Sequence, residues 1–210
     1  AMHTPTIFML AAGLAGADDF ALGGSVILAF ISNTVDAHIA NVTGGKRVRG
    51  ADEVGVKATS TEDIDLIAGA LAVAIGSTGI GAANTTIDMT NTVTAYIGAS
   101  SRVDVLGNLG LSVLATSSED ILTIAGGGGV GSTAGIAGSA TINLITQNTS
   151  AYIGQGADIN ADSLSADPNV KVRATSTTDM LSIAGVITGA GTAAVGLGAD
   201  VAVINKTTEA

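Results

Sequence analysis

The sequence predicts an all-β protein built as a parallel β-helix, and three observations support this prediction. One phrase recurs at long, even intervals along the chain. Apolar and polar residues alternate with a period of two inside each copy, which is typical of strands with one buried face. The apolar residues are small: 47% of the chain is hydrophobic, yet only 2% is aromatic. Such side chains suit a narrow interior between stacked layers better than a globular core.

The repeated phrase sets the domain organisation. ATSTEDIDLIAG begins at Ala58, ATSSEDILTIAG at Ala115 and ATSTTDMLSIAG at Ala174, so the copies start 57 and 59 residues apart. Self-similarity at a fixed period indicates an array in which each unit covers the apolar face of its neighbour. We therefore expect a single fragment over 1–210 with about three and a half repeats, approximately 1–57, 58–114, 115–173 and 174–210, and two or three windings per repeat.

The alternation predicts which side chains face the interior. In VKVRATS the apolar residues occupy every second position, while Lys171, Arg173 and Thr175 occupy the positions between them. In TIDMTNTVTAYI the outward positions are polar except for Tyr96. The residues predicted to face inward are Val54, Val56, Ala58, Ile87, Met89, Val93, Ala95, Ile97, Leu111, Val113, Ala115, Val170, Val172 and Ala174.

An aspartate recurs five residues after each aligned alanine, as Asp63, Asp120 and Asp179. Ser, Thr and Asp close turns through hydrogen bonds to their own backbone, so TSTED, TSSED and TSTTD are predicted to be turns that end the strands. A row of calcium-binding carboxylates is the second interpretation. It is disfavoured because the Gly-Gly-x-Gly-x-Asp motif of calcium-loaded repeats is absent. We therefore predict no metal site.

Two copies contain Gly/Ala-rich runs, at 124–140 and 183–199. Glycine allows tight corners and close packing against another layer. The segment 180–204 is long enough for a transmembrane helix, but its glycines disfavour a helix and no basic flank marks it, so we expect no membrane insertion. An antiparallel sandwich is the other alternative; a 57-residue unit with almost no aromatics is too small to form one alone.

Charge and composition limit the partners. The net charge is −10, from 18 acidic and 8 basic residues, which disfavours nucleic acid. The basic run GGKRVRG (44–50) is predicted to be a solvated turn. The chain has no cysteine, so disulfides and thiolate sites are excluded, and its histidines are His3 and His38. We expect no enzymatic activity, no catalytic residue, no cofactor-binding residue and no cofactor.

The order VxVxATSxxDxLxIAG, a Gly/Ala stretch, then VxVINKTTEA resembles the repeats of large secreted bacterial surface proteins. These are filamentous-haemagglutinin-like and leukotoxin-like adhesins exported by autotransporter or two-partner secretion. The resemblance covers nearly the whole chain. It implies a right-handed parallel β-helix within a long stalk, a secreted or cell-surface location, and a role in cell adhesion and virulence. The first copy departs from the pattern, with AAG for IAG and AHIA for AYIG.

An outward aromatic row is the candidate binding feature. His38, Tyr96 and Tyr152 occupy one aligned slot, once per copy. Covering a corner of the winding is one interpretation; contacting a host glycan or surface protein is the other.

We expect a non-enzymatic structural stalk segment, with a direct glycan- or protein-binding module as the alternative. An ice-binding solenoid and a polysaccharide-degrading β-helix are minor alternatives. Exposed strand edges at the two ends of the fragment predict end-to-end self-association.

Overall fold

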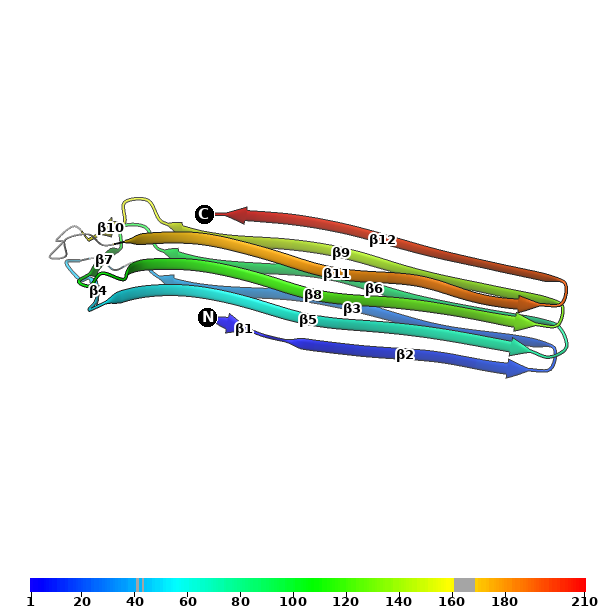
Figure 1. Ribbon diagram of the computed structural model, residues 1–210. Coiled ribbons are helices and arrows are strands. Elements are labelled where there is room, and N and C mark those ends of the chain that lie inside the picture. The colour runs from blue at the N-terminus through cyan, green and yellow to red at the C-terminus, as the bar shows by residue number, and fades with distance from the viewer. Residues whose placement is uncertain (41, 43, 161–168) are drawn as a thin grey trace.

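The computed structural model describes residues 1–40, 42, 44–160 and 169–210. Long strands run back and forth and lie side by side, with tight turns at one end and short strands at the other (Figure 1). The described residues contain no helix, and the strands form three sheets in which every paired strand is parallel. The prediction of an all-β chain with parallel strand pairing is confirmed.

Each passage of the chain adds one strand to each of two long sheets. Sheet A contains β1 (Met2–His3), β2 (Thr6–Ala17), β5 (Glu53–Ala74), β8 (Gly110–Gly131) and β11 (Val170–Ala190). Sheet B contains β3 (Phe20–Ile39), β6 (Thr78–Ile97), β9 (Ala134–Ile153) and β12 (Ala193–Glu209). Sheet C contains β4 (Val48–Gly50), β7 (Arg102–Val105) and β10 (Asp158–Ile159). We call one passage through the sheets a winding.

The register shows that one repeat forms one winding, not the two or three that we expected. Ala58 pairs with Ala115, and Ala115 pairs with Ala174, so the same position of each repeat lies directly above its counterpart. The expectation was wrong because the strands are about four times longer than the mean strand of five to six residues. A single pass through sheets A, B and C uses the whole repeat.

The predicted turns at TSTED, TSSED and TSTTD are also wrong. Asp63, Asp120 and Asp179 lie in the middle of β5, β8 and β11, with exposed side chains. The strands continue because the polar side chains at these positions are satisfied without a turn, either by solvent or by partners in sheet B. The chain reverses instead at short links, such as Asp18–Asp19 between β2 and β3 and 75–77 between β5 and β6.

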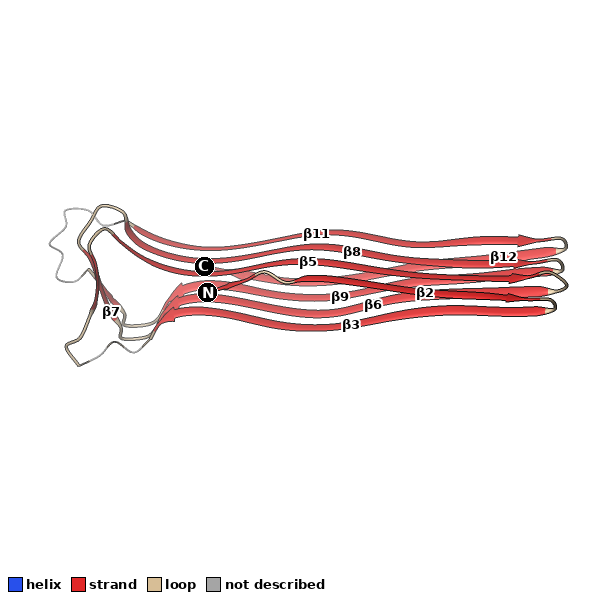
Figure 2. Ribbon diagram, turned by 90° about the horizontal axis from the view of Figure 1, so that it is seen from below, coloured by secondary structure: helices blue, strands red, loops and turns tan. Residues whose placement is uncertain are grey.

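The apolar interior is widest beside sheet C. One core cluster there combines residues from all three sheets, including Val56, Val93 and Val103. The predicted inward residues of β5, β6 and β8 are buried. On β11, the last strand of sheet A, Val172 and Ala174 are half-buried and Val170 is exposed. Figure 2 shows the chain spreading into a broader outline where β7 lies.

The two long sheets approach backbone to backbone near the tight turns. A Cβ atom added to Gly81 would lie 1.9 Å from the carbonyl oxygen of Gly128 in the opposite sheet, and one added to Gly127 would lie 2.2 Å from that of Gly138. Only alanines form the buried apolar cluster at this end: Ala21, Ala72 and Ala74. In β2, β5 and β8 the inward positions at this end hold only glycine and alanine, which permits the close approach. In the last winding Val186 and Thr188 occupy the inward positions and face Gly196 of the opposite sheet. The segment 180–204 lies in strands β11 and β12 and the link between them.

Gly81→Val should lower the free energy of unfolding by about 3 kcal/mol, because the new side chain meets backbone that cannot rotate away. Gly138→Val is the matched control. It makes the same change on the outer side of sheet B, where an added Cβ has nothing within 4 Å. Denaturant unfolding followed by far-ultraviolet dichroism measures both. Equal stability of the two variants would contradict the close approach of the sheets.

Candidate functional site: a polar ladder inside and an aromatic ladder outside

A column of polar side chains crosses the interior between sheets A and B. Ser60 and Glu62 of β5 point inward, and Glu62 is only 1% exposed. Asn33 of sheet B points toward them from the opposite layer, and Asn91 points in the same way toward Ser117 and Glu119 of β8. We call the whole set the internal polar ladder; its members are Asn33, Ser60, Glu62, Asn91, Ser117, Glu119, Gln147, Ser176, Thr178 and Lys206.

The asparagines tie each winding to the next. Asn33 Nδ2 donates to Ser60 Oγ and to Glu62 Oε1, both at 2.9 Å, and reaches Asn91 Oδ1 at 3.2 Å. Asn91 repeats the arrangement one winding further, where its Nδ2 donates to Ser117 Oγ at 3.0 Å and to Glu119 Oε1 at 2.9 Å. Asparagine thus serves as the donor that a buried carboxyl and a buried hydroxyl require.

The ladder continues to the last winding with different residues. Thr178, at the position of Glu119, places its hydroxyl 3.0 Å from Gln147 Oε1 and 3.2 Å from Glu119 Oε2, so its single hydrogen can be donated to either acceptor. Ser176 also donates to Gln147 Oε1, at 2.9 Å. Lys206 Nζ donates to Thr178 Oγ1 at 2.9 Å. A continuous chain of hydrogen bonds therefore links all four windings through the interior.

The electrostatics of the ladder are unusual because two glutamates stack without an ion-pair partner among the described residues. Burial raises the pKa of Glu62, and the Glu119 carboxylate raises it further; the Asn33 and Ser60 hydrogen bonds and the positive charge of His3 act against this rise. Oε2 of Glu62 has no hydrogen-bond partner in the described part of the chain. Burial therefore makes Glu62 easier to protonate than an exposed glutamate.

The outward aromatic row forms a stacked ladder on sheet B. The rings of His38 and Tyr96 have centroids 4.9 Å apart and planes 16° apart; those of Tyr96 and Tyr152 are 5.0 Å and 8° apart. Asp36 Oδ1 lies 2.5 Å from His38 Nδ1. Partial burial raises the pKa of Tyr96, and the carboxylate of Asp36 adds to the effect. The row presents a flat aromatic surface, and Tyr152 remains 44% exposed.

The three aspartates considered for calcium form a second outward column. Asp63 pairs with Asp120 and Asp120 with Asp179, all on the outer side of sheet A. Within the described ranges, no group of three or more acidic or histidine side chains is arranged to hold a metal ion. The three carboxylates lie side by side on neighbouring strands and face solvent.

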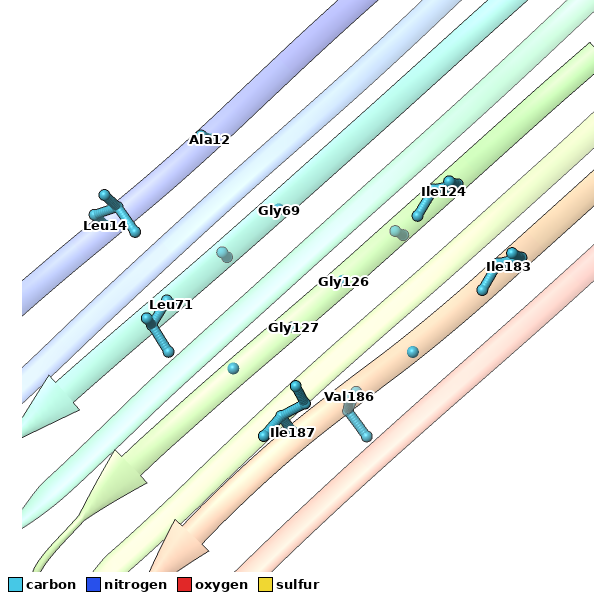
Figure 3. Close-up of a pocket in the computed structure, with 14 residues that line it drawn as sticks. Ala12, Leu14, Gly69, Leu71, Ile124, Gly126, Gly127, Ile183, Val186 and Ile187 are labelled. Carbon is cyan, nitrogen blue, oxygen red and sulfur yellow. The ribbon is translucent and has the colours of Figure 1, made fainter.

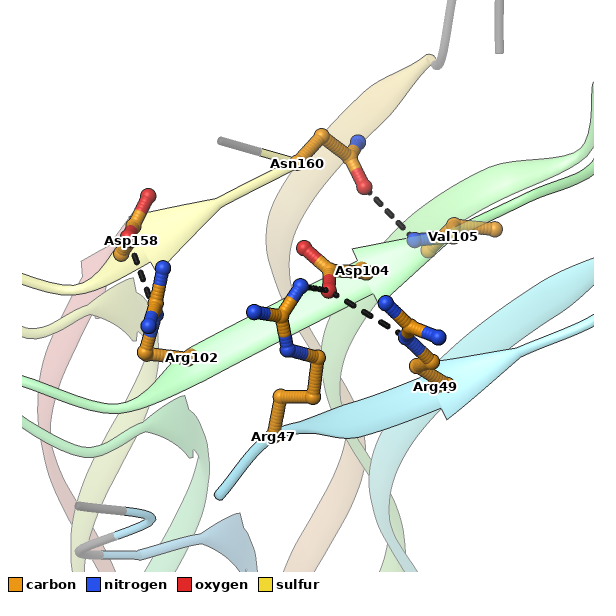
Figure 4. Close-up of polar contacts among 7 residues, drawn as sticks. All are labelled: Arg47, Arg49, Arg102, Asp104, Val105, Asp158 and Asn160. Carbon is orange, nitrogen blue, oxygen red and sulfur yellow. Dashed lines mark hydrogen bonds and ion pairs between the residues drawn. The ribbon is translucent and has the colours of Figure 1, made fainter. Parts of the chain in front are cut away.

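The basic run 44–50 contributes to sheet C. Arg47 and Arg49 approach the carboxylate of Asp104, at 2.7 Å and 3.6 Å. Arg102 pairs with Asp158 at 3.2 Å (Figure 4). Asn160 Oδ1 accepts a hydrogen bond from the backbone of Val105. These contacts join neighbouring windings, so the basic side chains stabilise the short sheet. The run is not only a turn, because Val48–Gly50 forms β4.

The comparisons identify no relative. No protein-family model, no curated protein and no solved structure matches the chain. The part of the chain that the structure describes contains no helix with the length and hydropathy needed to cross a bilayer.

Sequence reasoning found the aromatic ladder but missed the internal polar ladder. The signal was present in the alternation: counting by twos from Ala58 reaches Ser60 and Glu62 on the inward face. Counting from Met89 reaches Asn91 in the same way. The alternation alone does not predict these positions as buried, because charged and amide side chains are rarely buried in a narrow core.

Asn91→Leu should destabilise the protein by about 3 kcal/mol, because it keeps the volume similar but leaves buried groups at Ser117 and Glu119 without their donor. Asn91→Gln is the matched control and should lose much less, since Gln147 occupies the equivalent position one winding further. Urea unfolding measures both. Equal losses in the two variants would show that Asn91 acts by packing alone.

Glu62→Gln should remove a pH dependence of stability. The native state binds the Glu62 proton more tightly than the unfolded chain does, so this residue's contribution is complete below about pH 4.5, its ordinary pKa. The contribution is lost as pH rises through the raised native pKa. Wild type should therefore lose stability relative to Glu62→Gln between acidic and neutral pH.

Denaturation midpoints measured from acidic to neutral pH test this expectation. Glu209→Gln is the control, because it removes one exposed negative charge without touching the ladder. A constant difference between wild type and Glu62→Gln across the range would contradict a raised pKa of Glu62 in the native state.

Proposed function

We propose that the chain is a segment of a right-handed parallel β-helix that serves a structural, non-enzymatic role in a secreted or cell-surface bacterial adhesin. The observation that carries this proposal is the unbroken register between windings. β11 pairs with β8 from Val170–Leu111 to Ala190–Gly131, and β12 pairs with β9 over its whole length. Right-handedness is supported by the strong general preference for right-handed connections between parallel strands.

The dimensions favour a broad plate over a slender rod. Each winding uses about 57 residues but extends the stack by only about 4.8 Å, while a strand of 20 residues is about 66 Å long. Each added winding therefore extends the segment only a short distance for the number of residues it uses. It offers two wide outer faces, and these faces are the feature that a surface protein of this kind would display.

Composition supports export. The chain has no cysteine and a net charge of −10, which favour secretion in an unfolded form and solubility outside the cell. Contacts lie between successive windings, so each folded winding can template the next. The order of the repeated phrases adds the resemblance to exported adhesins. An outer-membrane transporter gene beside the coding sequence would support this part of the proposal, and a parent protein without any export signal would contradict it.

The second candidate function is direct binding of a glycan or host protein by the aromatic ladder. The stacked rings of His38, Tyr96 and Tyr152 provide the specific observation in its favour. Aromatic rings with a polar tip are common at recognition surfaces because they combine apolar area with hydrogen bonding. A ligand with flat apolar faces, such as a pyranose ring, fits a row of this kind.

A double variant, Tyr96→Ser with Tyr152→Ser, separates the two candidates. If the segment is purely structural, neither the wild type nor the double variant should bind saturably to a glycan array or to host cells. Thr90→Ser, an exposed change on the same side of sheet B, is the control. Saturable binding that the double variant loses and the control keeps would replace the structural proposal with a binding module.

A further inference from the structure

The outer side of sheet A changes character along its strands. Near the tight turns it is apolar, and Leu71, Ile124 and Ile183 line a groove together with Gly69 and Gly126 (Figure 3). Toward sheet C the outward positions of the same strands include hydroxyl and charged side chains. A second hollow, of about 290 Å³, lies at this polar end on β8 and β11. Its lining differs from that of the groove because it combines positive charge, hydroxyl groups and one apolar side chain.

Two neighbouring strands supply the lining of this second hollow, which we call the cationic hollow. In the register of β8 and β11, Leu114 lies beside Arg173 and Thr116 lies beside Thr175. Arg173 Nε donates to Thr175 Oγ1 at 3.1 Å, which holds the guanidinium next to the hydroxyl. The two cations are exposed, while the leucine and the two threonines are half-buried. The full lining is Leu114, Thr116, Lys171, Arg173 and Thr175.

The positive charge of the cationic hollow is not neutralised by a neighbouring acid. Neither Lys171 nor Arg173 forms an ion pair in the part of the chain that the structure describes. Asp179 lies on the same strand and the same side of the sheet, but six residues beyond Arg173, which is about 20 Å along an extended strand. Leu114 separates Arg173 from Lys57 of β5, because it pairs with both in register and keeps these like charges from meeting directly.

The charge of Lys57 is offset within its own strand. A Cβ atom built on Gly55 would lie 3.5 Å from Glu53 Oε1 and 3.8 Å from Lys57 Cε, so the two side chains bend toward each other over this glycine. Glu53 Oε1 also accepts a hydrogen bond from Ser112 Oγ at 2.6 Å. The cations left without an opposite charge on this part of sheet A are therefore the two that line the cationic hollow.

We propose that the cationic hollow binds the carboxylate of a single acidic sugar, of the uronic-acid type, within an otherwise uncharged glycan. The guanidinium of Arg173 and the ammonium of Lys171 donate charge-assisted hydrogen bonds to the carboxylate. The hydroxyls of Thr116 and Thr175 can donate to or accept from the sugar hydroxyls. Leu114 offers apolar contact to the C–H groups of the sugar ring. Apolar surface with a few polar groups that fix orientation is the usual composition of a small-ligand site.

The charge of the whole chain restricts the ligand to one acidic group. The net charge is −10, so an extended polyanion such as nucleic acid, a heavily sulfated glycan or an anionic bilayer is repelled by the rest of the molecule. A polyanion that followed β11 from Arg173 would meet Asp179 on the same side of the sheet. A ligand whose charge is confined to the hollow avoids this repulsion. The site goes beyond the proposed structural function and shares no residue with the aromatic ladder on sheet B.

Sodium glucuronate is the probe for the proposed site, and glucose is its uncharged counterpart. Amide NMR spectra of the full chain should show saturable shifts at Leu114, Thr116 and Thr175 with glucuronate and none with glucose. Sodium acetate carries the carboxylate without the ring, so it should bind more weakly than glucuronate. Binding of glucuronate should weaken as sodium chloride is added, because the two cations are exposed and their charges are screened by salt.

Removing the two cations should remove the binding. The double variant Lys171→Gln with Arg173→Gln should raise the dissociation constant for glucuronate by at least about tenfold. Lys46→Gln with Lys57→Gln is the matched control, because it removes the same number of positive charges from exposed side chains outside the hollow. The control should bind glucuronate as the wild type does. Far-ultraviolet dichroism should show the same strand content in both double variants, since all four side chains face solvent.

Any of five results would overturn the proposal. The first is the absence of saturable glucuronate binding. The second is equal binding of glucose, which means that charge is not recognised. The third is equal binding of acetate, which means that the sugar ring is not recognised. The fourth is an equal loss of binding in the control variant. The fifth is binding to phosphatidylserine vesicles, but not to glucuronate, that the Lys171 and Arg173 variant loses, which assigns the hollow to a lipid headgroup. None of these results affects the proposed structural function, which rests on the register between windings.

Discussion

The register of one winding per repeat is the constraint on which the rest of the structure depends. Parallel pairing places each residue about 4.8 Å from the residue one repeat later, on both long sheets. Equivalent residues of successive repeats therefore form a column, and the side chains in each column must be able to pack against similar side chains directly above and below. Aliphatic residues, amides, aromatic rings and glycines all meet this condition, and each forms a separate column in this chain.

The internal polar ladder shows how a buried polar column is made tolerable. Stacked glutamates repel when ionised, and their burial is costly. Asn33 and Asn91 supply donors from the opposite sheet, and the last winding changes to Thr178, with Lys206 at its end. Because the hydrogen bonds link successive windings, the ladder also opposes a slip of one strand by a single residue, which would bring outward side chains into the interior.

Where the sheets approach closely, large apolar side chains lie on the outer surface instead of in the interior. Where backbone meets backbone, the interior has no room for large side chains, and the aliphatic residues of these strands lie on the outside. In β2, β5 and β8 the inward residues near the tight turns are glycine and alanine, and the outward residues include leucine, isoleucine and valine. A packing constraint in the interior thus accounts for an exposed apolar surface. On the outer side of sheet A this surface lies near the tight turns, and polar residues lie further along the strands.

The sequence by itself determined the repeat length, the strand alternation and the columns of equivalent residues, because these follow from spacing along one chain. The aromatic ladder of His38, Tyr96 and Tyr152 was predictable for that reason. Only the tertiary structure decided which residues meet across the two sheets. Asn33 and Glu62 belong to different windings and share no motif, so no local pattern predicts their contact. The number of windings per repeat and the separation of the sheets were likewise decided by packing, since strand length depends on how the polar residues at TSTED find partners in the opposite layer.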